Sequence, residues 1–274
     1  MNNSIDGKIE LIFSGNSGRT IAEKVYHEGN MRVSSNVELS NEKTPMYFLI
    51  GTGGGLIEGE KYQIDIDAMQ GTHAILKTQT PTYVYKCLNG KHTEQIINLN
   101  LKDSFIEYIT DEVIPYANAI YSQTTTINMD KNSTLIYSDG ITSGWAPNEK
   151  SFLFTKVKQK TQIFMDDKLI FNDILLLDPQ NQPINETGYF EGKENYNSLV
   201  IIDSRIDKAF IDKLQLELTD KYSKIKHGVS LLNIPGMVLR TLSQTAYENK
   251  KLIFFVINYF RMNCHNYPEI EFLY

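Results

Sequence analysis

Three carboxylates stand at positions where side chains could do chemistry. Glu60, Asp139 and Asp173 each follow or end a segment with the pattern of a β-strand. A buried carboxylate is costly unless it is paired, hydrogen-bonded or bound to a cation, so these residues are candidates for cation binding or acid–base work. The alternative is that each is a solvated turn residue at a strand end, since Asp and Glu are usually exposed.

Two carboxylates on a β-rich scaffold are also the machinery of a glycosidase, in which one acts as an acid and the other as a base or nucleophile. The sequence does not give the distance between the two carboxylates that this mechanism demands. The chain also has a single tryptophan, Trp145, whereas sugar-binding platforms usually need more aromatic surface. A β-rich carbohydrate-active hydrolase is therefore the alternative function for this chain.

Cys87 and His92 flank Asn89-Gly90, a dipeptide typical of two-residue hairpin turns. In such a hairpin Cys87 faces His92 directly across the ladder. A thiolate and an imidazole at that distance suit Ni²⁺ or Zn²⁺. Two ligands do not make a tight site, so an ordinary cross-strand pair is the alternative.

Hydrophobic alternation with a period near two runs from about residue 8 to 202 and predicts β-strands. In residues 62–68, for example, Tyr62 and Ile64 face one way while Gln63 and Asp65 face the other. Turn signals such as Asn89-Gly90 recur between these segments and favour many short, antiparallel strands. A mainly β body over residues 1–204 follows.

Two helices are expected in a small α+β part over residues 205–274. Residues 206–218 carry apolar side chains four apart, and residues 241–262 have an apolar face that opens with Thr241 and Gln244 as a capping box. Between them, residues 228–242 read as strand with a turn at Pro235-Gly236. No sharp composition break separates the two parts, so we expect a single domain over residues 1–274.

The second helix has more aromatic residues than one face can bury. Phe254, Phe255 and Tyr259 are the candidates for contact with a partner protein, and burial in the chain's own core is the alternative.

The composition excludes several classes of protein. The chain has 274 residues and a formal net charge of −6, so it lacks the cationic face that nucleic acids require. Two cysteines make no disulfide framework, and the apolar run at residues 11–13 is too short for a signal peptide. The longest apolar run, residues 252–257, is far below the roughly 20 residues that span a bilayer. We expect a soluble, cytoplasmic protein.

Two glycine-punctuated segments, residues 53–60 (GGGLIEGE) and 138–144 (SDGITSG), stand on either side of the segment 78–85 (TQTPTYVY). Together they resemble the UreD (UreH) family of urease accessory proteins, from about residue 8 to about residue 262. The chain departs from the family's usual residues at Glu60 (Asp), Tyr83 (Lys) and Trp145 (Arg). Glu149 also stands one position earlier, relative to Phe152, than the family's Gly-Glu-x-Phe pattern would place it.

The resemblance implies a layered, β-helix-like winding of many short strands. It also implies that the chain is a urease maturation factor, not an enzyme, which binds apo-urease and recruits UreF and the GTPase UreG. The C-terminal part would dock UreF, which would join two heteromeric complexes into a dimer. The chain would hold no tight cofactor, and transient Ni²⁺ would pass through an interior lined by Glu60, Thr82, Asp139 and Asp173.

Overall fold

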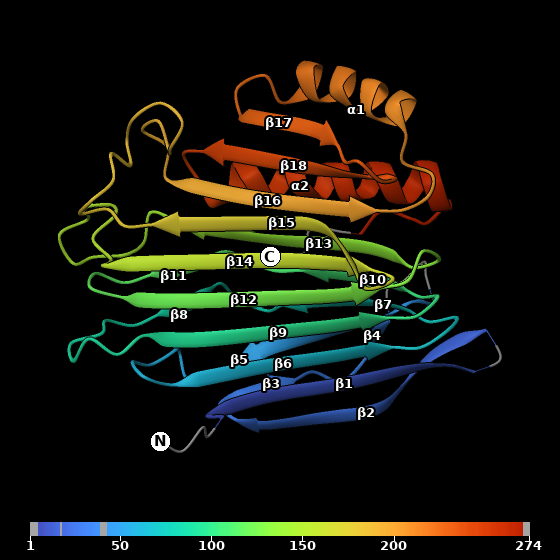
Figure 1. The fold of residues 1–274 in the computed structure, drawn as a ribbon, viewed down its shortest axis with the longest axis horizontal. Helices are drawn as coiled ribbons and strands as arrows, with labels where there is room; N and C mark the ends of the chain where they lie inside the picture. Colours follow the sequence, from blue (N-terminus) through green and yellow to red (C-terminus); the bar gives the residue numbers. More distant parts are fainter. Residues whose placement is uncertain (1–4, 17, 39–42, 271–274) are drawn as a thin grey trace.

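The chain folds into two stacked β-sheets with helices on one side, as Figure 1 shows. A computed structural model describes residues 5–16, 18–38 and 43–270. Within these residues the strands form a seven-stranded and an eleven-stranded sheet, here called the first sheet and the second sheet.

From edge to edge, the first sheet contains β15 (Lys168–Leu177), β14 (Lys156–Met165), β12 (Ile120–Met129), β9 (Thr93–Leu101), β6 (Lys61–Ala68), β1 (Gly7–Asn16) and β2 (Arg19–Gly29). The second sheet contains, in order, β17 (Lys226–Leu231), β18 (Gly236–Ser243), β16 (Asn195–Ile202), β13 (Thr134–Thr142), β10 (Phe105–Ile109), β7 (His73–Thr78), β5 (Pro45–Gly51) and β3 (Met31–Val33). Three short strands join this sheet from the side: β4 (Val37–Glu38) pairs with β5, and β11 (Val113–Pro115) pairs with both β13 and β8 (Thr82–Val84).

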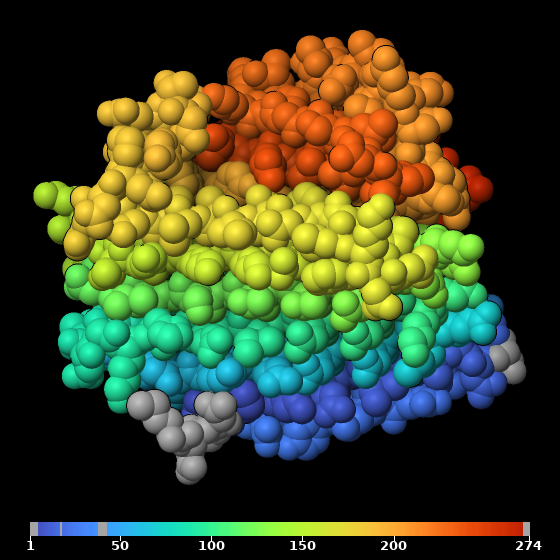
Figure 2. Space-filling view, in the orientation of Figure 1, coloured from blue at the N-terminus to red at the C-terminus, as the bar shows by residue number. Residues whose placement is uncertain are grey.

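The middle of the chain winds as a solenoid. Strand β6 in the first sheet is followed by β7 in the second, and the pairs β9 with β10 and β12 with β13 repeat this step. Equivalent strands of successive turns pair in parallel, and the turns follow one another as coloured bands in Figure 2. The predicted mainly β fold with a layered, β-helix-like winding is thereby confirmed.

The expectation of antiparallel pairing was wrong for this winding. Strands β6, β9, β12 and β14 are parallel neighbours. Antiparallel pairs occur at β1–β2, β3–β5, β4–β5, β14–β15 and β13–β16 and in the C-terminal strands. The turn signals at residues 89–90, 102–103 and 130–132 connect the two sheets, and the one at residues 166–167 joins the neighbours β14 and β15. A parallel pair needs such a crossover between its strands. The turn expected at Asp139-Gly140 was wrong, because both residues lie within β13.

The alternation of the sequence fixes which side chains enter the core. In β6, Tyr62, Ile64, Ile66 and Ala68 are buried between the sheets, while the residues between them are half-buried on the outer face. In β9, Ile97, Leu99 and Leu101 follow the same pattern. These face assignments are confirmed.

Helices α1 (Lys208–Lys221) and α2 (Ala246–Phe260) cover the outer face of the second sheet. A second core forms there, in which Leu214 of α1 and Ile257 of α2 are wholly buried with Ile75 of β7. A π-helical turn, η1 (Arg261–His265), continues α2. No helix within the described residues is long and apolar enough to cross a membrane.

The N-cap of α2 was predicted four residues too early, at Thr241 instead of Thr245. Thr241 belongs to β18, where it pairs with Asn197 of β16. The capping box is formed instead by Thr245 and Glu248, each of which bonds a backbone N–H of the other residue. Sheet pairing therefore outweighs the capping pattern at Thr241, because the strand continues the ladder begun at Gly236.

Candidate functional site

An internal chamber of about 380 Å³ lies between the two sheets. Its lining combines apolar side chains, such as Leu49, Ile64 and Ile97, with a large number of polar ones. The polar lining residues are Asn30, Thr52, Thr78, Thr80, Thr82, Thr110, Asp111, Gln95, Gln123, Gln159 and Asp139. Water or a hydrated ion could satisfy the polar groups of this lining, since buried polar groups require hydrogen-bond partners.

Three glutamines stand side by side on the wall of the chamber. Gln95 of β9 pairs in register with Gln123 of β12, which pairs with Gln159 of β14. All three side chains are buried, and the hydroxyl of Tyr121 donates to the Oε1 atoms of Gln95 at 2.6 Å and Gln123 at 3.1 Å. The parallel winding creates this row because it places equivalent positions of successive turns next to one another.

A chain of hydrogen bonds leads from this row to Asp139. The Nε2 of Gln123 donates to Thr125 Oγ1 at 3.3 Å, and Thr125 Oγ1 lies 3.1 Å from the hydroxyl of Tyr137. The Tyr137 hydroxyl donates to Asp139 Oδ2 at 3.0 Å, and Thr161 Oγ1 donates to the same atom at 3.3 Å. Asp139 is thus held by two hydroxyl donors at the inner wall.

Asp139 is half-buried and lines the chamber. Burial raises the pKa of its carboxyl to about 6, and the nearby charge of Asp173 acts in the same direction. The hydrogen bonds from Tyr137 and Thr161 and the charge of Arg240 oppose this shift. A carboxylate in this position gains stability from any cation that enters.

Asp173 lies next to Asp139 along the interior. On β15 it pairs in register with Thr161 of β14, and Asp139, Thr161 and Asp173 line a second, small cavity of about 10 Å³ together with Gln159, Leu175 and Tyr196. Because Asp139 and Gln159 line both cavities, the chamber and the small cavity adjoin. The second cavity is about the size of one water molecule and forms a constriction.

Thr82 lines the chamber at the opposite end, beside the glycine segment of residues 51–55. Here the backbone crosses close to Tyr83, since a Cβ at Gly55 would lie 3.0 Å from the Cβ and the carbonyl oxygen of Tyr83. Gly54 has a φ of +75°, which favours glycine. The segment is therefore a tight backbone crossing at the rim of the chamber.

Glu60 is not among the residues that line the chamber. Its carboxylate accepts a hydrogen bond from the Tyr62 hydroxyl, and Asn30 Nδ2 donates to that hydroxyl at 3.4 Å. Asn30 lines the chamber, so Glu60 is connected to the lining only through the Tyr62 hydroxyl and Asn30. Of the four residues expected along the interior, Thr82 and Asp139 line the chamber, Asp173 shares the small cavity with Asp139, and Glu60 lines neither.

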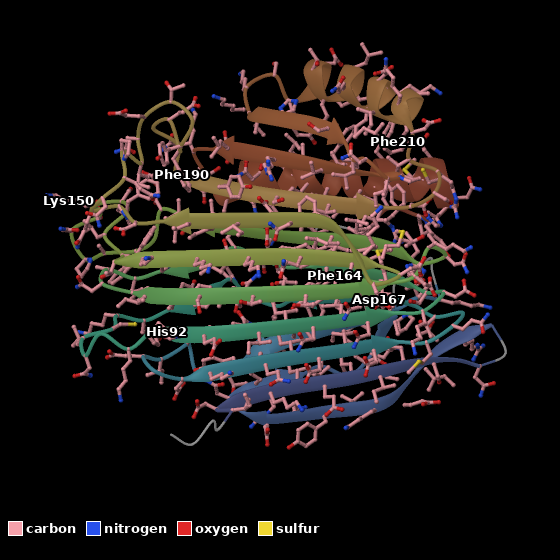
Figure 3. The ribbon with its side chains drawn as sticks, viewed as in Figure 1. His92, Lys150, Phe164, Asp167, Phe190 and Phe210 are labelled. Atoms are coloured by element: carbon pink, nitrogen blue, oxygen red, sulfur yellow. The ribbon has the colours of Figure 1, made fainter. Side chains whose placement is uncertain are left out.

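The hairpin expected at Asn89-Gly90 is not formed. Cys87 lies within the loop that connects β8 of the second sheet to β9 of the first, so it does not pair with His92 in a hairpin. Cys87 is buried, and its Sγ accepts from the backbone N–H of Ile120 at 3.3 Å. His92 is exposed at one end of the molecule (Figure 3). The turn signal was correct, but the segment crosses between sheets and the geometric basis of the metal hypothesis is wrong.

No group of three or more His, Cys, Asp or Glu side chains that could hold a metal ion occurs among the residues that the structure describes.

The three C-terminal aromatics differ in exposure. Phe255 and Tyr259 are half-buried and line a surface groove between α1 and α2, with Tyr222 and Met262. Phe254 is 4% exposed, and its ring centre lies 4.8 Å from the Nζ of Lys77 beneath the helix. Phe255 and Tyr259 can therefore meet a partner directly, whereas Phe254 belongs mainly to the core.

Sequence reasoning missed the glutamine row and Arg240, whose guanidinium lies 2.9 Å from Asp173. The glutamines left a signal that could have been used. Gln95, Gln123 and Gln159 occupy the buried phase of alternating strands, where an apolar residue is usual. Arg240 left none, because the strand that carries it is far from Asp173 in the sequence.

The chain matches the model of the UreD urease accessory protein family over residues 6–271. The urease accessory protein UreD of Streptococcus salivarius is 46% identical over 272 residues, which cover 99% of this chain and 97% of that protein. That of Streptococcus thermophilus is 45% identical over 267 residues, 97% of this chain and 95% of the relative. A more distant relative, UreD of Ureaplasma parvum, is 31% identical over 251 residues, with 90% and 88% covered. The chain therefore belongs to the UreD family of urease accessory proteins.

Proposed function

We propose that this chain is a scaffold for urease maturation that conducts nickel through its interior towards the urease active site. Membership of the urease accessory protein family gives the chain a role in urease maturation. The conducting route is the finer part of the proposal, and the structure of the interior supports it.

The observation that carries the proposal is the position of Asp139, which lines both the large chamber and the small cavity that contains Asp173. The route begins at the glycine rim beside Thr82, passes the glutamine row and reaches the two aspartates. Oxygen ligands of this kind accept divalent ions such as Ni²⁺ without binding them irreversibly.

The size of the cavities indicates how the ion would travel. Six waters occupy about 180 Å³ at roughly 30 Å³ each, so a hydrated ion fits the chamber of about 380 Å³. The constriction of about 10 Å³ holds no more than about one water. Passage there requires loss of hydration or movement of side chains, and the carboxylates of Asp139 and Asp173 can replace lost water ligands.

The partners follow from the family's role. We propose that the chain binds apo-urease and recruits UreF and the GTPase UreG, and that UreF joins two such complexes into a dimer. The groove lined by Phe255 and Tyr259 is the surface that we assign to UreF. The chain itself catalyses no step in this scheme, and GTP hydrolysis belongs to UreG.

The carbohydrate hydrolase is the less favoured function. The two candidate carboxylates, Asp139 and Asp173, share a cavity of only about 10 Å³, which has no room for a sugar ring. Trp145 is half exposed beside Tyr116, and it is not among the residues that line either cavity. Neither position resembles a sugar-binding platform.

The test is urease activation in cells that carry the cognate urease operon without its own UreD gene. Wild type is expected to restore urease activity and bound nickel, and the variant Asp139→Asn/Asp173→Asn is expected to restore neither while still co-purifying with UreF. The matched control is Asp166→Asn/Asp167→Asn, which changes two carboxylates of the turn between β14 and β15. Equal rescue by the two double variants would remove the acidic route from the mechanism.

A further inference from the structure

Arg240 bridges the two sheets where the interior meets solvent. It lies on β18 of the second sheet, and its Nη2 is 2.9 Å from Oδ1 of Asp173 on β15, the edge strand of the first sheet. The guanidinium also donates a hydrogen bond to the hydroxyl of Tyr196 on β16. One side chain therefore binds both Asp173 and Tyr196, which are two of the residues that line the small cavity.

Arg240 lies on the outer side of these two residues. Its side chain is 50% exposed, whereas that of Asp173 is 27% exposed, and Arg240 is not among the residues that line the small cavity. In Figure 1, β15 ends the first sheet while the second sheet continues through β16 to β18, so Arg240 on β18 lies beyond the edge strand of the first sheet. Arg240 covers the edge at the level of the constriction.

The charges in this region are unbalanced without Arg240. Asp139 and Asp173 are close enough for the charge of Asp173 to disfavour ionisation of Asp139, and the charge of Arg240 counteracts this. A divalent cation at Asp173 would supply the same compensation. The guanidinium and an arriving cation therefore compete for one carboxylate.

We infer that Arg240 is a displaceable counter-ion that closes the route at the β15–β18 edge and yields Asp173 to a divalent cation. This inference rests on the proposed function and adds a specificity residue to it. The half-exposed guanidinium can move into solvent by rotation of its own side chain, and an exposed ion pair of this kind is weak enough to exchange. No covalent step is involved.

The alternative is that Arg240 only fastens the two sheets together. The two roles differ in their effect on cation binding, because a purely structural arginine does not compete with a metal ion. Ni²⁺ binding by the purified full-length chain, measured by titration calorimetry and equilibrium dialysis, separates them.

The variant Arg240→Gln is expected to bind Ni²⁺ about five- to tenfold more tightly than wild type. Adding Asp173→Asn to it should abolish the gain, because the carboxylate released by the first change is then missing. Arg240→Lys keeps a cation at this position and is expected to stay within about twofold of wild type. Because Arg240→Lys keeps the charge, a difference in Ni²⁺ affinity between the Lys and Gln variants reports the loss of charge. Urea denaturation of each variant shows whether it is folded.

The matched control is Arg205→Gln. Arg205 is 48% exposed and lies 3.6 Å from Asp203, so it is a similar half-exposed arginine paired with an aspartate elsewhere in the chain. Its loss should leave Ni²⁺ affinity unchanged.

Unchanged or weaker Ni²⁺ binding by a folded Arg240→Gln variant would overturn the inference about Arg240. The proposed route would still stand if Asp139→Asn/Asp173→Asn abolished urease activation. Conversely, full urease activation by that double variant would refute the proposed nickel route. Tighter Ni²⁺ binding by Arg240→Gln would in that case show only that Arg240 is a counter-ion of Asp173. The two failures are therefore distinguishable.

Discussion

The carboxylate of Glu107 and the guanidinium of Arg261 form an ion pair in which both side chains are wholly buried. Glu107 lies on β10 in the middle of the second sheet, and Arg261 begins the π-helical turn after α2. His73 of β7 also bonds Glu107, with Nε2 and Oε1 2.7 Å apart. The pair fastens the C-terminal helical layer to the solenoid.

Removal of one member of this pair should destabilise the protein strongly. Glu107→Gln is expected to lower the free energy of unfolding by about 3–5 kcal/mol, because it leaves the guanidinium of Arg261 buried and uncompensated. The double variant Glu107→Gln/Arg261→Met should recover part of this loss, since no buried charge remains. Urea denaturation monitored by circular dichroism measures both.

The control for this prediction is Lys221→Ala, which removes an exposed pair with Glu217 on α1. Its cost should be no more than about 0.5 kcal/mol. A cost for Glu107→Gln as small as that of the control would contradict the anchoring role.

Asp139 should make the stability of the protein depend on pH in an unusual direction. Its pKa is raised from 3.8 to about 6 in the folded state, so the folded state holds more protons than the unfolded state between these values. Stability from this group is therefore present below about pH 4 and is lost as the pH rises through about 6.

The shift of about two pKa units corresponds to roughly 3 kcal/mol. Asp139→Asn cannot ionise, so the difference in unfolding free energy between wild type and this variant should change by that order between pH 4 and pH 8, in favour of the variant at high pH. Urea titrations at several pH values measure this difference in unfolding free energy. The contributions of other titrating groups are the same in both proteins and cancel. A difference that is flat over this range would show that Asp139 is not desolvated.

Gly144 should not tolerate a side chain. It has a φ of +89°, and a Cβ there would lie 2.2 Å from the carbonyl oxygen of Pro115. Gly188 has the same φ and nothing within 4 Å of the added atom, which makes it a matched control. Gly188→Ala should cost about 1 kcal/mol for the backbone conformation alone.

Gly144→Ala should cost clearly more than Gly188→Ala, because the backbone of Pro115 must also move. Thermal denaturation of the two variants gives the comparison. Equal melting temperatures would mean that the contact at Pro115 relaxes without cost, and that only the φ angle requires glycine.

The groove between α1 and α2 should respond to substitution at its exposed positions. Phe255→Ser combined with Met262→Ser is expected to reduce co-purification of UreF by about tenfold or more, as loss of central apolar contacts does at interfaces. Phe254→Ser should act differently and lower stability, because Phe254 is nearly fully buried. Retained UreF binding by a folded Phe255→Ser/Met262→Ser variant would place the UreF surface elsewhere.

Much of the fold follows from local pattern. The alternation in residues 62–68 assigns Tyr62 and Ile64 to the core because successive side chains of a strand point to opposite faces. The four-residue spacing of Phe210, Leu214 and Leu218 predicts α1 for a similar local reason. The start of α2 was predicted wrongly because Thr241 pairs in the sheet with Asn197. Asn197 lies 44 positions earlier in the sequence (241 − 197), so no local pattern shows this pairing.

The sequence by itself determined the strand faces, the two helices, the family and the polar character of Asp139 and Thr82. Only the tertiary structure decided that the strands run in parallel turns, that three glutamines form one row, and that Arg240 meets Asp173. The physical reason is that local periodicity records which face is buried, whereas stacking register depends on contacts between residues far apart in the chain. A cavity is what that stacking leaves unfilled, and no single segment encodes it.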